Sequence, residues 1–149
     1  MAGLFWPLLG ILAGAVVATQ ASINAELARG LGSPFAAAAT SFLSGTVLLA
    51  LVTAIVAQAS GASIGWRVPP LWLFIVGGAL GAAFVTSGII LIPRMGAAAT
   101  MAFIVAGQLM AGMLLDRIGF MGMAVREITL GRISGAIMLL AGALLIRFH

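Results

Sequence analysis

The end of one apolar segment, a turn and the start of the next can be read from Thr19–Phe35, TQASINAELARGLGSPF. Gln20 and Asn24 lie four residues apart, so on a helix of about 3.6 residues per turn they share one face. The run Gly30–Pro34, GLGSP, supplies glycines to leave one helix, then a serine N-cap and a proline at the first helical position. This short turn predicts two antiparallel neighbouring helices, the first with an amide pair on one face.

The composition indicates an integral membrane protein. The 149 residues are 63% hydrophobic and only 7% charged, with a mean hydropathy of +1.27, values that a soluble domain of this size could not carry on its surface. The net charge of +4 comes from arginines at expected helix ends, which favours interfacial anchoring over nucleic-acid binding. Zero cysteines exclude disulfides and cysteine chemistry. The sequence has no nucleophile–base pair, metal cluster or phosphate loop, so we expect neither an enzyme nor a cofactor.

The charged residues separate apolar segments of about 20 residues, the length that crosses a hydrocarbon core. We therefore expect a single all-α transmembrane domain over residues 1–149. The expected helices cover residues 4–28, 34–59, 71–92, 97–118 and 129–146, with Pro93–Gly96 as a tight turn. The first segment lacks the cationic start of a signal peptide, so we expect a permanent span. Five spans place the two termini on opposite sides of the membrane.

The positive charges give only a weak signal for orientation. Four arginines fall on the N-terminal side of the expected topology and three on the other: Arg67, Arg117, Arg126 and Arg132 against Arg29, Arg94 and Arg147. Because an arginine excess normally fixes the cytoplasmic side, a near balance allows insertion in both orientations. Two copies could then pair antiparallel into ten helices with inverted halves, as in many transporters. A single topology with weak signals is the alternative, and charge alone does not separate the two.

Several short motifs recur in one known family. They are Gln20-x-x-x-Asn24-x-x-Leu27, Gly32-Ser33-Pro34-Phe35, Ser41-Phe42-x-x-Gly45-Thr46, Asp116-Arg117-x-Gly119-x-x-Gly122, Arg132-x-x-Gly135, and Leu139 with Ala141 and Gly142. With them the chain resembles the small five-helix YdcZ-like proteins of the bacterial drug/metabolite transporter superfamily. The resemblance implies a multi-pass protein of the bacterial inner membrane that is half of a ten-helix inverted-repeat transporter. Such a protein works as a dual-topology homodimer or with a related chain, and no substrate follows from the resemblance.

Five residues are candidates for substrate binding. Gln20 and Asn24 offer uncharged donors and acceptors, although such amides also serve as bonds between helices. Gln108, in the fourth expected helix, has the same two interpretations. Trp6 lies on the Gln20 face of the first helix and would give an apolar wall. Ser41 is included, although a hydroxyl in a helix more often bonds the carbonyl one turn back.

Two acids are candidates for ion coupling. Glu26 lies about 120° from Gln20 around the helix and three residues before Arg29, which favours a surface ion pair. Asp116 is followed directly by Arg117 near the end of the fourth helix, where an acid usually anchors. An acid facing an aqueous vestibule could instead carry a proton.

These features favour a secondary transporter that moves a small lipophilic or amphipathic organic solute by alternating access. The expected partners are that solute, the lipid bilayer and an antiparallel second copy. We expect Gln20, Asn24 and Gln108 to line one central cavity. A dual-topology ion channel and a non-transporting membrane interaction subunit are the alternatives, since both would show polar helix faces or small-residue surfaces.

Overall fold

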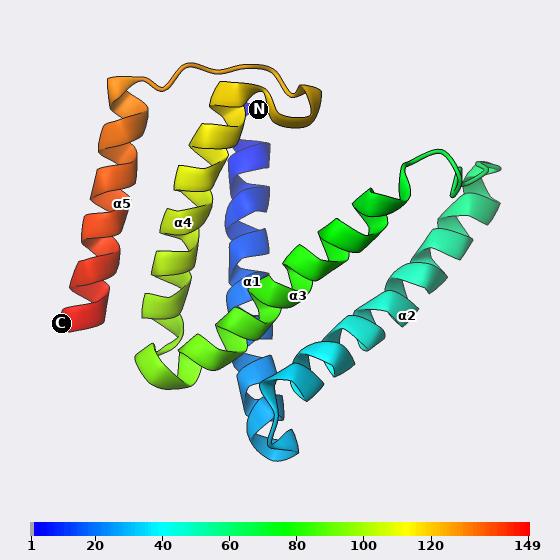
Figure 1. Cartoon of the computed structure of the whole chain (residues 1–149), viewed down its shortest axis with the longest axis horizontal. Helices are drawn as coiled ribbons and strands as arrows, with labels where there is room; N and C mark the ends of the chain where they lie inside the picture. The colour runs from blue at the N-terminus through cyan, green and yellow to red at the C-terminus, as the bar shows by residue number, and fades with distance from the viewer. Residues whose placement is uncertain (1) are drawn as a thin grey trace. The chain divides into compact units, whose positions relative to one another are not determined.

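The computed structural model describes residues 2–149 as five long helices and one short 3₁₀ turn (Figure 1). These are α1 (Ala2–Leu31), α2 (Pro34–Ser60), α3 (Leu71–Met95), α4 (Ala97–Ile118), η1 (Phe120–Gly122) and α5 (Leu130–Phe148). All five long helices are long and apolar enough to cross a membrane. The predicted all-helical protein with five membrane-spanning helices is confirmed.

The helix ends differ from the prediction at two turns. The helix α1 continues to Leu31, and Gly32, with φ of 69°, takes the left-handed conformation that ends it. The helix α3 continues through Pro93 to Met95, so the predicted four-residue turn is only Gly96. A proline in the last turn removes few helical bonds, and the N–H of Gly96 still donates to the carbonyl of Ile92 at 2.9 Å.

The chain forms two compact units, the first ending at Ile90 and the second comprising Leu91–His149. The first unit contains α1, α2 and most of α3, and the second contains α4, η1 and α5. In both units most large apolar side chains are exposed. This is the pattern of helices whose apolar sides face lipid rather than a protein core.

Small residues lie at the points where the three helices of the first unit meet. Its buried centre consists of Ala37, Ala38 and Ile89 from α2 and α3, with Leu27, Ala28 and Val85 packed against them. A Cβ built at Gly88 of α3 would lie 3.7 Å from the Cβ of Ala21 in α1, an ordinary contact distance. Because lipid is as apolar as the side chains, the hydrophobic effect does not hold membrane helices together. Close contact between their backbones contributes to their association instead.

The turn between α1 and α2 has the predicted chemistry. The Ser33 hydroxyl caps α2 by accepting a hydrogen bond from the N–H of Ala36 at 3.2 Å, and Pro34 occupies the first helical position. The cap satisfies one of the free N–H groups of the first turn. The antiparallel pairing of α1 and α2 therefore begins at a defined residue, which fixes how their polar side chains meet.

In the second unit, α4 and α5 run side by side and are joined by a long connection (Figure 1). Gly119, with φ of 62°, ends α4, and the Thr129 hydroxyl caps α5 by accepting from the N–H of Arg132 at 3.3 Å. The N–H of Arg126 donates to the carbonyl of Asp116 at 3.0 Å. This bond folds the connection back onto the end of α4.

Candidate functional site

A pocket between α1 and α2 contains three of the predicted site residues. Its volume is about 570 Å³, within the range of sites for small molecules. Gln20 and Asn24 lie on its α1 wall, on one helix face as their spacing predicts, and Ser41 lies on its α2 wall. The complete lining is Ala15, Val16, Thr19, Gln20, Ile23, Asn24, Ser41 and Ser44.

Asn24 links the two walls of this pocket. Its side chain is only 4% exposed, and its amide Nδ2 donates to the Ser41 hydroxyl oxygen at 3.1 Å. Ser41 therefore accepts a hydrogen bond from the neighbouring helix, whereas hydroxyls in helices usually donate to a carbonyl of their own helix. The bond uses one of the two N–H donors of the Asn24 amide.

Gln20 lies one turn from Asn24 and has a different environment. Its side chain is exposed and forms no hydrogen bond with another residue of the described part of the first unit, residues 2–90. An amide that loses water without gaining a partner costs about 1 to 3 kcal/mol. In an apolar membrane segment, a hydrogen-bonding partner from outside this unit would remove that cost for Gln20.

The other two hydroxyls that line the pocket bond their own helices. Thr19 donates to the carbonyl of Ala15, and Ser44 to the carbonyl of Thr40, both at 2.9 Å. Sequence reasoning did not include Ser44 among the site residues. The signal was present, because Ser41 and Ser44 lie three residues apart and so share a helix face.

Trp6 and Glu26 lie outside the pocket. Trp6 packs edge-to-face on Phe5, with ring centroids 5.1 Å apart, and lies nearly four turns before Gln20, or about 21 Å along a helix. Glu26 pairs with Arg29, as their three-residue spacing predicts, and both side chains are highly exposed. The structure therefore gives Trp6 no place beside the amide pair.

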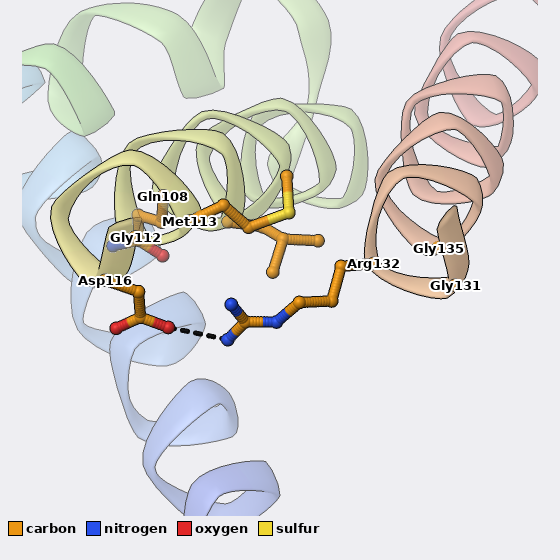
Figure 2. Close-up of a pocket in the computed structure, with 8 residues that line it drawn as sticks. Gln108, Gly112, Met113, Asp116, Gly131, Arg132 and Gly135 are labelled. Atoms are coloured by element: carbon orange, nitrogen blue, oxygen red, sulfur yellow. Dashed lines mark hydrogen bonds and ion pairs between the residues drawn. The ribbon is translucent and has the colours of Figure 1, made fainter. Parts of the chain in front are cut away.

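A second pocket, of about 350 Å³, lies between α4 and α5 (Figure 2). It brings together Gln108 and Asp116, which lie on one side of α4. Gln108 therefore lines a pocket of the second unit, and the pocket with Gln20 and Asn24 lies in the first. The complete lining is Gln108, Leu109, Gly112, Met113, Asp116, Gly131, Arg132 and Gly135.

An ion pair crosses this second pocket. The Arg132 Nη2 atom lies 2.6 Å from the Asp116 Oδ2 atom, and each side chain is 31% exposed. The Nη1 atom of the same guanidinium donates to the carbonyl of Glu127 at 3.3 Å. Figure 2 shows the arginine reaching from α5 toward the carboxylate on α4.

Sequence reasoning noted that Arg117 directly follows Asp116 and did not place Arg132 at a site. The available signal was a lone arginine inside the first turn of an otherwise apolar helix, at Gly131-Arg132-x-x-Gly135. Glycines on either side of an arginine leave room around a long side chain. A charge at this position is expected to seek a partner within the protein.

Comparison with known proteins places this architecture in a family. The profile of the family described as "Putative inner membrane exporter, YdcZ" matches residues 5–145. The chain is 40% identical over 75 residues to the "Inner membrane protein YdcZ" of Escherichia coli (strain K12), a stretch that is 50% of this chain and 50% of that protein. The alignment thus spans about half the length of this curated relative. No solved structure matches the chain. The five membrane-spanning helices and the family match together show that the chain belongs to the YdcZ family of multi-pass inner membrane proteins.

Proposed function

We propose that this protein is a secondary transporter that moves a small, uncharged amphipathic solute through the pocket between α1 and α2. Two copies in opposite orientations would form the working unit and expose the solute to each side in turn. The family description as an exporter supports transport. The solute class and the dimer are argued from the pocket and from the helix surfaces.

The observation that carries the proposal is the unpaired amide of Gln20 beside the paired amide of Asn24. Both line a pocket whose other side chains are small, hydroxylated or aliphatic. An amide offers donors and an acceptor without fixed charge, so it suits hydroxyl, amide or carbonyl groups. The apolar remainder of the lining suits a hydrocarbon body. The polar and apolar parts of the lining together fit an amphipathic solute.

The surface of α1 supports pairing with a second copy. A Cβ built at Gly10 or Gly14 meets no atom of α2 or α3 within 4 Å. A Gly-x-x-x-Gly pair lets the backbone of another helix approach closely, so this pair is free to receive a helix from a second copy. The balance of four arginines against three is compatible with insertion of that copy upside down.

Counterflow in proteoliposomes tests the transport activity. The purified protein is reconstituted, the vesicles are loaded with unlabelled solute, and uptake of labelled solute is followed for chloramphenicol and a panel of uncharged amides and alcohols. A carrier gives transient, saturable accumulation of the label. Empty liposomes give the passive background for each solute.

The same vesicles separate the alternatives. A channel would give electrical current at rates far above those of a carrier. It would give no transient accumulation of labelled solute in vesicles loaded with unlabelled solute. A non-transporting interaction subunit would give neither counterflow nor current. Absence of counterflow for every solute in the panel would contradict the proposed solute class.

A topology assay tests the antiparallel dimer separately. The C-terminus is fused in turn to a reporter active only in the cytoplasm and to one active only outside it. Strong signal from both fusions is expected for dual insertion. Signal from one fusion alone would contradict the homodimer and point to a second, related chain.

A further inference from the structure

We propose that the pocket between α4 and α5 is a binding site for small organic carboxylates, with Arg132 as the anion-binding residue and Asp116 as its built-in competitor. The ligand carboxylate would take the place of the Asp116 carboxylate on the guanidinium. This site is distinct from the pocket between α1 and α2 that Gln20 and Asn24 line. Its occupancy is measured at equilibrium and does not depend on transport.

The hydrogen bonds of Arg132 leave most of its donors free. A guanidinium has five N–H donors, and two hydrogen bonds from this one are seen in the described part of the second unit, to Asp116 and to the carbonyl of Glu127. The contact with Asp116 uses one nitrogen and one oxygen rather than two parallel bonds. A carboxylate ligand can approach such a guanidinium through two parallel bonds, which is the stronger geometry.

The net charge of the segment that joins α4 to α5, counted with Asp116 and Arg132, favours an anion over a cation. Positions 116–132 carry three positive and two negative side chains, an excess of one positive charge: Arg117, Arg126 and Arg132 against Asp116 and Glu127. Arg132 also lies in the first turn of α5, where the helix dipole is positive. In Figure 2 one oxygen of Asp116 faces Arg132 and the other points away from it.

The shape of the pocket defines the rest of the ligand. Gln108 lies eight residues before Asp116 on the same helix, which is about 12 Å along its axis. Between them the wall is Leu109, Gly112 and Met113, largely apolar. A ligand with its carboxylate on Arg132 would therefore place an apolar body against this wall, within a volume of about 350 Å³.

The glycine wall of α5 provides a steric test that leaves the ion pair in place. A Cβ built at Gly135 meets no atom within 4 Å, and Gly135 lines the pocket. A leucine there would fill the pocket without striking the backbone. Gly142 offers a matched control, because it is also free of neighbours within 4 Å, is seven residues further along α5 and lies outside the pocket lining.

The experiment measures binding of benzoate, and of its uncharged analogue benzamide, to the full chain in lipid nanodiscs by isothermal titration calorimetry. The decisive protein is Asp116→Asn, which keeps the side-chain shape and removes the competing charge. We expect it to bind benzoate several-fold to about tenfold more tightly than the wild type. Benzamide is expected to bind more weakly than benzoate and to be unaffected by the substitution.

Two further variants, each made in the Asp116→Asn background, locate the site. Arg132→Gln is expected to abolish the preference for benzoate, and Gly135→Leu to abolish binding while Gly142→Leu does not. Helical content by circular dichroism confirms that each variant is folded. Equal binding of benzoate and benzamide, weaker benzoate binding in Asp116→Asn, or full binding in folded Gly135→Leu would each overturn the proposal.

Discussion

The side-chain amide of Asn24 donates a hydrogen bond to the Ser41 hydroxyl at 3.1 Å, and this bond connects α1 to α2 at the pocket that both residues line. Asn24 is 4% exposed, so its amide has little access to other partners. The bond therefore has a structural role beside any contact with a solute. It fixes how α1, the helix that carries Gln20, is aligned along α2.

Removal of the Ser41 hydroxyl is expected to destabilise the protein. Ser41→Ala leaves the Asn24 donor unpaired, which should lower the free energy of unfolding by about 0.6 to 2 kcal/mol, the range for bonds between membrane helices. Unfolding of the purified protein by SDS, followed by circular dichroism, measures the change. Ser44→Ala is the control, because its hydroxyl bonds the carbonyl of Thr40 in its own helix; an equal loss for both variants would contradict a special role of the Asn24–Ser41 bond.

The two ion pairs seen among residues 2–149 should differ in their contribution to stability. The Asp116–Arg132 pair is 31% exposed on each side and joins two helices, so Arg132→Gln should lower the free energy of unfolding by about 1 kcal/mol. Arg29→Gln removes the highly exposed pair with Glu26. This substitution should change the free energy of unfolding by a few tenths of a kcal/mol at most. The charge-swapped double variant Asp116→Arg/Arg132→Asp should recover part of the loss, and failure to do so would show that the pair is not an energetic link between α4 and α5.

The local contact of Phe42 in α2 with α3 depends on Gly81. A Cβ at this position would lie 3.3 Å from the Cζ atom of Phe42, so Gly81→Leu is expected to overpack the contact at a cost of about 1 to 3 kcal/mol. Gly78→Leu is the control, because a Cβ there has no neighbour within 4 Å. SDS unfolding of both variants, and of Gly81→Leu combined with Phe42→Leu, measures the effect. Phe42→Leu is expected to reduce the loss of stability caused by Gly81→Leu, and an unchanged loss in the double variant would contradict this contact.

The fold was largely predictable because hydropathy and turn chemistry are local properties. Five apolar segments, the Ser33 cap and the glycine exit from α1 all follow from neighbouring residues. Pro93 was misleading for the same reason. A proline usually ends a helix, but here it sits in the last turn of α3, and Gly96 makes the exit by itself.

The sites were predictable only in part because side chains meet across helices. The shared face of Gln20 and Asn24 follows from their spacing within one helix, whereas the choice of Ser41 as partner depends on how α2 packs against α1. Asp116 and Arg132 are sixteen residues apart, and the fold of the connection between α4 and α5 brings them together. No periodicity within one helix indicates that pairing.

The transport proposal depends most directly on Gln20. Counterflow is measured for wild-type protein, for Gln20→Leu and for Gln58→Leu, a glutamine on α2 that is also exposed but lies outside the pocket. Loss of one hydrogen bond to the solute is worth roughly a factor of ten, so Gln20→Leu should lower the initial rate about tenfold and Gln58→Leu should not change it. Wild-type flux through folded Gln20→Leu would contradict the assignment of the α1–α2 pocket as the transport site.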